Sequence, residues 1–186
     1  REITDLVSFK MENQLDVEVS KMSANASVNS AEREADFWVF GGIFRPVYLE
    51  AVPRAHMAYS GIDAKADGKI NLEVVLDKEL AQASLQVDIF DSQTGEKKKS
   101  FTSTAAASAS KRLLANASVS DISPWSSENP HLYRAVITLL ERGKPVHQTT
   151  ERFGFRTVEV RERDGLYING VKMRFKGVNR HCFWPT

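Results

Sequence analysis

Short stretches in which apolar and polar residues alternate, separated by turn signals, run through the middle of this chain of 186 residues. Apolar side chains recur at every second position in residues 70–76 and 85–89, and Asp67-Gly68 marks a turn before the first of them. Alternation with a period of two is typical of strands with one buried face. Strands repeated at this spacing with turns between them indicate a β-sandwich. We therefore predict an all-β fold for residues 54–156.

The predicted sandwich must rely on apolar packing, because Cys182 is the only cysteine and no disulfide can form within the chain. The expected core consists of the alternating apolar positions Leu72, Val74, Leu76, Leu85, Val87, Ile89, Val136 and Leu139. Cys182 follows His181, which raises the alternative of a cysteine nucleophile. A small buried thiol is the preferred interpretation, since no third group that would orient such a pair is in view.

Further elements are expected on both sides of the sandwich. Residues 15–19 alternate, and residues 46–52 alternate after a leading proline, so both are predicted to be strands. Residues 23–34 are small and polar and are expected to form a loop. The Asn-Gly pair at Asn169-Gly170 predicts a β-hairpin over residues 166–173.

Charge and hydropathy exclude two classes of partner. The chain carries 25 basic and 24 acidic residues, so it lacks the basic excess typical of proteins that bind nucleic acid or acidic membranes. No apolar run approaches the roughly 20 residues of a membrane-spanning helix, and the first residues are polar, unlike a signal peptide. We expect neither a nucleic-acid partner nor a membrane.

Hydrogen-bonding side chains are concentrated near the end of the chain. Residues 174–178 are expected to form a buried strand, and Asn179-Arg180-His181 follows it directly. Polar residues at the carboxyl end of a strand are where an α/β barrel places its chemistry. The structural alternative is an edge strand whose charged end is solvated.

Four passages, in the same order, resemble glycoside hydrolase family 2, the β-galactosidase-like enzymes. They are Asp36-Phe37-Trp38 followed by Gly42-Ile43-Phe44-Arg45, the run from Trp125 to Tyr133, Phe153-Gly154-Phe155-Arg156, and Gly177-Val178-Asn179-Arg180-His181 with Pro185. The order of the passages is more specific than any one of them.

The resemblance implies a domain organisation. Residues 1–54 would be the C-terminal part of a sugar-binding jelly roll, and residues 55–156 an immunoglobulin-like β-sandwich. Residues 157–186 would be a hairpin and the first strand of the catalytic (β/α)8 barrel, truncated here. The expected fold is therefore an immunoglobulin-like sandwich flanked by jelly-roll strands and one barrel strand.

The resemblance also implies sugar contacts at Asp36, Asn179, Arg180 and His181. His181 would contact the sugar and stabilise the charged transition state, with Asn179 and Arg180 forming the floor of the site. Asp36 would reach sugar hydroxyls and serve as an ion ligand, and its place two residues before Trp38 favours a galactosidase over a glucuronidase. An aspartate that caps its own loop is the structural alternative. No cofactor is expected in this chain, whereas an alkali-metal or magnesium ion is implied for the parent enzyme.

The catalytic residues are expected elsewhere. A retaining glycosidase uses two carboxyl groups about 5–5.5 Å apart, and in the resembled family both are glutamates on later barrel strands. Glu159, Glu162 and Asp164 lie in polar hairpin sequence without a matching motif, so we expect this chain alone to be inactive. Residues 182–184 are Cys-Phe-Trp where family members often carry acidic and histidine residues, which suggests a changed preference beyond the scissile sugar.

These observations favour the non-catalytic portion of a β-galactosidase that hydrolyses terminal β-galactosides. The alternatives are a stand-alone module that binds carbohydrate through Trp38, Trp125 or Trp184, and a structural spacer without a ligand. A binding module needs exposed aromatic rings, whereas Trp125 is expected to pack at a domain contact. The sequence leaves open the sugar linkage, a homo-oligomeric state and the compartment, although a polysaccharide-degrading enzyme would suit the periplasm or the cell exterior.

Overall fold

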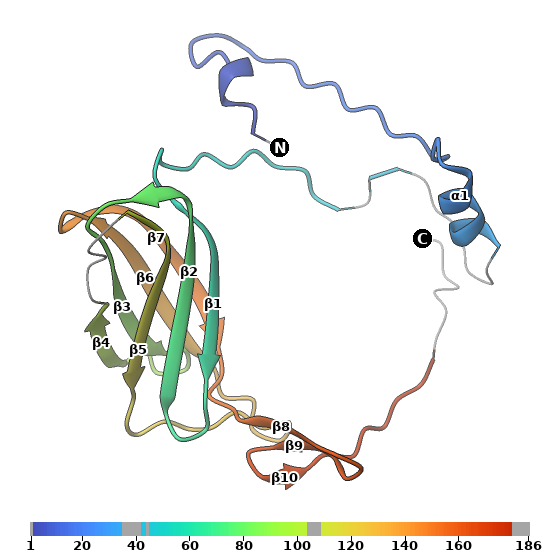
Figure 1. Cartoon of the computed structure of the whole chain (residues 1–186). Coiled ribbons are helices and arrows are strands. Elements are labelled where there is room, and N and C mark those ends of the chain that lie inside the picture. Colours follow the sequence, from blue (N-terminus) through green and yellow to red (C-terminus); the bar gives the residue numbers. More distant parts are fainter. Residues whose placement is uncertain (1, 35–41, 44, 104–108, 180–186) are drawn as a thin grey trace. The chain divides into compact units, whose positions relative to one another are not determined.

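The computed structural model describes residues 2–34, 42–43, 45–103 and 109–179. The chain divides into two units, one of residues 1–49 with 176–186 and one of residues 50–175. The second unit contains a β-sandwich and a three-stranded hairpin sheet (Figure 1).

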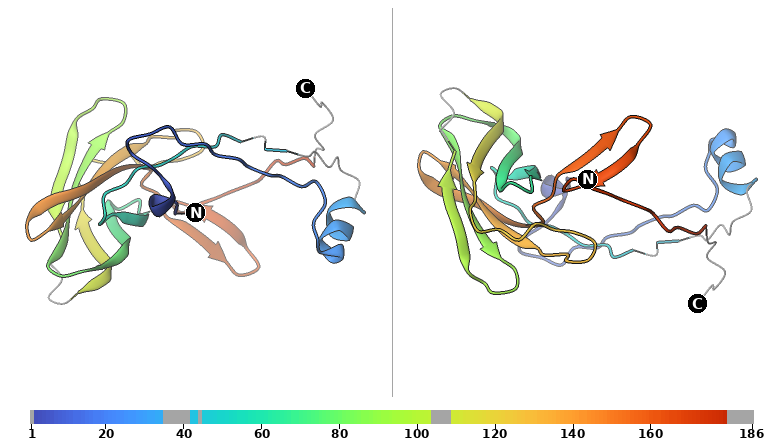
Figure 2. Two further views of the ribbon diagram at one scale, coloured as in Figure 1. Left: turned by 90° about the horizontal axis from the view of Figure 1, so that it is seen from above. Right: turned by 90° about the horizontal axis from the view of Figure 1, so that it is seen from below.

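Seven strands build the sandwich, and all neighbouring strands are antiparallel. In chain order they are β1 (Met57–Ala64), β2 (Lys69–Leu80), β3 (Ala83–Asp91), β4 (Lys97–Thr102), β5 (Ser110–Ser118), β6 (Tyr133–Glu141) and β7 (Lys144–Phe153). One sheet has the order β1-β2-β5 and the other β4-β3-β6-β7. The two sheets lie face to face in every view (Figures 1 and 2). This two-sheet arrangement is that of immunoglobulin-like domains, so the predicted all-β sandwich is confirmed.

The core forms because alternating side chains of both sheets meet between them. Along β2, the residues Ile70, Leu72 and Val74 are buried, while Lys69 and Asn71 point outward. Burial of each large apolar side chain contributes about 1.5–3 kcal/mol. Seven of the predicted core residues are buried: Leu72, Val74, Leu76, Leu85, Val87, Ile89 and Leu139.

Val136 is the exception among the predicted core residues, because it is only half-buried. Val136 and Leu139 are separated by an odd number of positions, so on a strand of period two they face opposite sides. The core face of β6 carries Ala135, Ile137 and Leu139 instead.

A buried tyrosine anchors the irregular passage between β5 and β6. Tyr133 opens β6, is 1% exposed, and accepts a hydrogen bond from the Ser123 backbone N–H at 2.7 Å. Its ring packs against Phe153 and Phe155, with centroids 6.0 and 5.0 Å away. This is the tyrosine corner of immunoglobulin-like sandwiches.

The hairpin sheet follows the sandwich as β8 (Val158–Arg161), β9 (Gly165–Ile168) and β10 (Val171–Lys172), in the order β10-β9-β8. The turn between β9 and β10 has Asn169 at φ 50° and Gly170 at φ 78°. Two successive positive φ angles are what a type I′ turn requires, and Asn-Gly accepts them most readily. The predicted hairpin is therefore confirmed.

The flanking segments differ from expectation. Residues 23–34 were expected to form a loop but contain the helix α1 (Ala26–Arg33), which Asn25 caps by accepting a hydrogen bond from the Ser27 N–H at 3.0 Å. A short 3-10 helix, η1 (Thr4–Leu6), precedes it. The strands expected at residues 15–19, 46–52 and 174–178 are not formed.

The apolar side chains of those three segments are exposed, as Leu15 at 61% and Val178 at 90% show. A strand needs a neighbour that satisfies its backbone groups and covers its apolar face. No described residue supplies that neighbour here, so the alternating pattern alone does not produce a strand. Neither described helix is long and apolar enough to cross a membrane.

Two adjacent leucines of β5 test the assignment of its faces. Leu113 is 4% exposed in the core, and Leu114 is 63% exposed on the outer face. Leu113→Ala should lower the free energy of unfolding by about 2–5 kcal/mol because it leaves a cavity. Leu114→Ala should change it by no more than about 0.5 kcal/mol. Urea titration of both variants checks this, and equal effects would mean that the register of β5 is wrong.

Candidate functional site

The four residues expected to contact sugar are only partly described. Asn179 is exposed and lies outside any strand. Asp36, Arg180 and His181 lie outside the described residues, as do Trp38 and Trp184. The structure therefore places Asn179 at an exposed position and leaves the grouping of these residues as a prediction.

Of the three tryptophans considered for sugar binding, Trp125 is the one that the structure describes. Its backbone N–H donates to the Phe155 carbonyl at 2.8 Å, and its ring is half-buried. The guanidinium carbon of Arg156 lies 5.0 Å from the ring centroid, a cation–π contact. A Cβ atom on Gly154 would lie 2.8 Å from the Trp125 Cβ, so only glycine permits this approach. Trp125 thus packs against Gly154 and Arg156 at the end of its own sandwich, and the expected contact with a neighbouring domain stays a prediction.

Asn169 connects the hairpin turn to Trp125 at the end of the sandwich. Its side-chain amide donates to the Trp125 carbonyl at 2.9 Å, and its Oδ1 accepts from the Thr157 N–H at 2.9 Å. The Asn169 N–H donates to the Thr157 carbonyl at 2.8 Å. Thr157 Oγ1 in turn accepts from the Ala66 N–H, in the turn between β1 and β2, at 3.1 Å. We call Ala66, Trp125, Arg156, Thr157 and Asn169 the sandwich–hairpin junction.

The acidic residues of the hairpin do not form a catalytic pair with each other. Glu159 forms an ion pair with Arg161 at 3.0 Å, and Glu162 forms one with Arg163 at 3.7 Å. Asp164 accepts hydrogen bonds from Lys172 and Tyr167, which hold the pKa of its carboxyl below the usual range. A general acid needs a raised pKa, so Asp164 is unsuited to that role.

One buried acidic residue went unnoticed in the sequence. Asp91, at the end of β3, accepts hydrogen bonds from the backbone N–H groups of Thr94 and Gln93 at 3.0 and 2.8 Å. Its other oxygen lies 2.8 Å from His131 Nε2, and both side chains are buried. The Thr94 hydrogen bond, with those from Gln93 and His131, lowers the pKa of Asp91 to about 2. This arrangement closes the β3–β4 turn onto the start of β6 and is structural.

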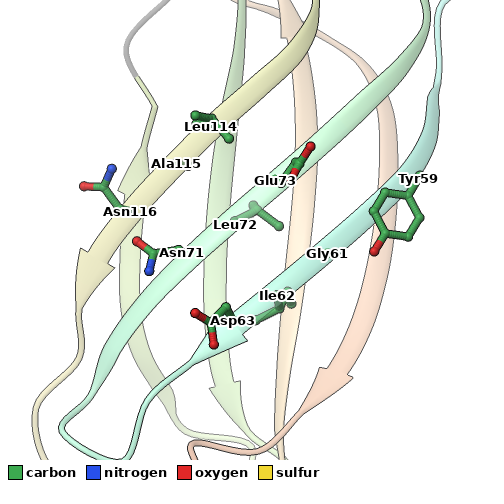
Figure 3. A pocket seen from close by; sticks show the side chains of 10 residues that line it. All are labelled: Tyr59, Gly61, Ile62, Asp63, Asn71, Leu72, Glu73, Leu114, Ala115 and Asn116. Carbon is green, nitrogen blue, oxygen red and sulfur yellow. The ribbon is translucent and has the colours of Figure 1, made fainter. Parts of the chain in front are cut away.

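A hollow of about 490 Å³ lies on the outer face of sheet β1-β2-β5 (Figure 3). Its lining includes Tyr59, Gly61, Asp63, Asn71, Glu73 and Asn116. Sequence reasoning missed it, because outward positions of alternating strands look like an ordinary solvated face. The signal that could have found it is the presence of glycine, aspartate and asparagine within strands, where these residue types are unfavourable.

The sandwich with its tyrosine corner defines an immunoglobulin-like domain, and a wider comparison assigns it to a family. Residues 50–156 match the family model of glycosyl hydrolases family 2. The match covers more than half of the chain, and the chain belongs to this family.

Relatives are similar over nearly the whole chain. A β-galactosidase of Lactobacillus delbrueckii subsp. bulgaricus is 31% identical over 94% of this chain, and one of Clostridium acetobutylicum is 32% identical over 98%. A putative β-glucuronidase of Formosa agariphila is 27% identical over 80%. The chain spans 17%, 20% and 18% of the length of these three proteins.

Solved structures agree in fold. A β-glucuronidase of Parabacteroides merdae superposes with a TM-score of 0.62 and 22% identity, covering 80% of this chain and 19% of that protein. A β-glucuronidase of Bifidobacterium dentium superposes with a TM-score of 0.52 and 22% identity, covering 62% of this chain and 20% of that protein. At this identity the likeness shows the fold alone.

Replacing Asn169 tests the junction. Asn169→Gly keeps the backbone at positive φ but removes both side-chain hydrogen bonds, to Trp125 and Thr157. We expect the free energy of unfolding to fall by about 1–3 kcal/mol, at about 0.5–1.5 kcal/mol for each bond. Asp121→Gly, at an exposed residue that also has a positive φ (54°), controls for the flexibility of glycine. Similar losses in the two variants would show that the side-chain bonds contribute nothing.

The Asp91 carboxylate predicts a specific pH dependence. Its pKa is lowered from 3.8 to about 2 in the fold, so its contribution to stability is present above about pH 4 and is lost as the pH falls towards 2. Asp91→Asn should therefore be less stable than the wild type at neutral pH. This difference in stability should disappear as the pH falls from 4 to 2. Thermal unfolding across this range checks it, with the exposed Asp121→Asn as the control for loss of a charge. A gap that stays constant with pH would contradict the assignment.

Proposed function

We propose that this chain is the non-catalytic portion of a retaining β-glycosidase that hydrolyses terminal β-galactosides. The observation that carries the proposal is the family match over residues 50–156. The length of the relatives supports it, since the chain spans less than a fifth of the Lactobacillus protein. The remaining polypeptide of such a protein has room for a catalytic barrel.

A galactoside is favoured over a glucuronide as substrate. The relatives that are 31–32% identical over more than nine-tenths of this chain carry the name β-galactosidase. The match to a putative β-glucuronidase is lower in identity and in coverage. The acid two residues before a tryptophan, at Asp36 and Trp38, points the same way through the resemblance.

In the proposed reaction, two carboxyl groups outside this chain act as acid/base and nucleophile in a double displacement. Asp36, Asn179, Arg180 and His181 bind and orient the sugar, and His181 stabilises the positive charge that develops on it. Residues 1–54 complete a jelly roll, and residues 157–186 lead into the barrel. Among the described residues, no group of three or more His, Cys, Asp or Glu side chains is placed to hold a metal ion, and no step is assigned to an ion.

The chain of 186 residues should not hydrolyse aryl β-glycosides. Without both carboxyl groups, general acid catalysis and covalent catalysis are lost together. Release of nitrophenol from nitrophenyl β-galactoside should equal that of a blank without protein. Activity that co-elutes with the chain through successive columns would contradict the proposal.

The longer polypeptide that contains this chain tests the site directly. It should cleave nitrophenyl β-galactoside with a far higher kcat/KM than the matching glucuronide. His181→Ala and Asp36→Asn should each lower kcat/KM for the galactoside by about a hundredfold, the size of effect expected when a group that stabilises the transition state is removed.

Asp16→Asn, at an exposed acid outside the four residues, is the matched control and should retain activity. If both Asp36→Asn and His181→Ala retain full activity, the residue assignment fails. If the glucuronide is the better substrate, the substrate assignment fails.

A further inference from the structure

We propose that the outer face of sheet β1-β2-β5 carries a second binding site, for a neutral oligosaccharide that stacks on Tyr59 and hydrogen bonds to Asp63, Asn71 and Asn116 (Figure 3). The proposal deepens the proposed function and rests on it only for the expectation that the sugar is of the galactoside type. The binding chemistry itself follows from the residues of the hollow.

The residue types in this hollow are unusual within strands. Glycine, asparagine and aspartate are depleted in strands, yet Gly61, Asp63, Asn71 and Asn116 all lie within β1, β2 or β5. The strand register brings them together, because Asp63 pairs with Asn71 and Asn71 pairs with Asn116. Residues that are unfavourable in strands and gather at one place are a mark of function.

The two asparagines have unused hydrogen-bonding capacity. Each side-chain amide offers two donors and one acceptor, and neither forms a side-chain hydrogen bond within the part of the chain that is described. Asp63 pairs with Lys65 at 2.8 Å but remains 57% exposed, so it can accept further bonds. With strands about 4.8 Å apart, the row from Asp63 to Asn116 is roughly 10 Å long. Such a row of donors and acceptors suits the hydroxyl groups of more than one sugar ring.

Tyr59 supplies an aromatic surface beside this row. A Cβ atom on Gly61 would lie 2.9 Å from the Tyr59 hydroxyl and 3.3 Å from its ring, so the tyrosine packs over the bare glycine backbone. The residue is nevertheless 61% exposed. A ring that packs on the backbone with one face and is exposed on the other can stack against the apolar C–H face of a pyranose. Aromatic side chains stack in this way on flat apolar groups. Figure 3 shows the ring on the same side of the sheet as Asp63 and Glu73.

The charges around the hollow favour a neutral ligand. Glu73 is paired with Arg112 at 2.6 Å, and Asp63 with Lys65, so these two cations are already neutralised. The carboxylate of a uronic acid would meet two carboxylates and no unpaired cation among the described lining residues. Like charges in close contact oppose binding. The site should therefore accept a neutral sugar and reject its uronate.

NMR titration of the chain tests the proposal. Lactose should shift the backbone amides of β1, β2 and β5 and the side-chain amides of Asn71 and Asn116, with a dissociation constant in the millimolar range. Methyl β-galactopyranoside and the uronate formed by oxidising its C6 are a matched pair for the effect of charge.

Tyr59→Ala and the double variant Asn71→Ala/Asn116→Ala should each weaken lactose binding by about tenfold or more, the loss of one stacking contact or a pair of hydrogen bonds. Gly61→Val should fill the hollow and abolish binding.

Tyr48→Ala is the matched control, because Tyr48 is 78% exposed and lies outside the sandwich, and it should leave lactose binding unchanged. Well-dispersed spectra show that each variant is folded. The proposal is overturned if lactose causes no shifts at saturating concentration, if the shifts lie on another face, or if the uronate binds as well as the neutral sugar. Its failure is separable from that of the proposed function, because lactose binding is measured on this chain and hydrolysis of an aryl galactoside on the longer polypeptide. Tyr59→Ala should leave that hydrolysis unchanged.

Discussion

The second unit depends on how the backbone of an irregular passage is satisfied. Residues 119–132 join β5 to β6, crossing between the sheets, and contain two prolines that cannot donate hydrogen bonds. Polar backbone groups left unpaired away from water are costly, so side chains from elsewhere must supply partners. Tyr133 bonds to Ser123, and Asn169 bonds to the Trp125 carbonyl. The passage is thereby held at Ser123 by the sandwich and at Trp125 by the hairpin.

The same contacts bind the hairpin to the sandwich. A sheet of three short strands needs a buried apolar face to be stable on its own. Val158, Val160 and Val171 of this sheet are exposed, and β10 is only two residues long. The sandwich–hairpin junction adds hydrogen bonds from Ala66 to Thr157, from Thr157 to Asn169 and from Asn169 to Trp125. The stability of the hairpin therefore comes in part from the sandwich. For the proposed function this matters, because the hairpin leads directly into the segment that carries Asn179, Arg180 and His181.

The sequence predicted what local patterns encode and missed what depends on neighbours. Alternation revealed the buried faces of β2 and β3, and Asn169-Gly170 revealed the hairpin turn, since each signal arises within a few residues. The alternating residues 15–19 gave the same signal, yet no strand forms there, because pairing is a property of two segments. The helix α1 was missed since its sequence is small and polar, and its start depends on the Asn25 cap. The hollow at Tyr59 was missed because only the register of three strands brings Asp63, Asn71 and Asn116 together.

The hydrogen bonds of the sandwich–hairpin junction should make the sandwich and the hairpin one cooperative unit. Native-state hydrogen exchange of the chain tests it most directly, by comparing the backbone amides of Trp125, Thr157 and Asn169 with that of Ile137 in the core. If the claim holds, all four amides exchange only through global unfolding and give the same free energy of opening. If the three junction amides exchange through local opening at a much lower free energy while Ile137 remains protected, the hairpin is an independent appendage and the claim is contradicted.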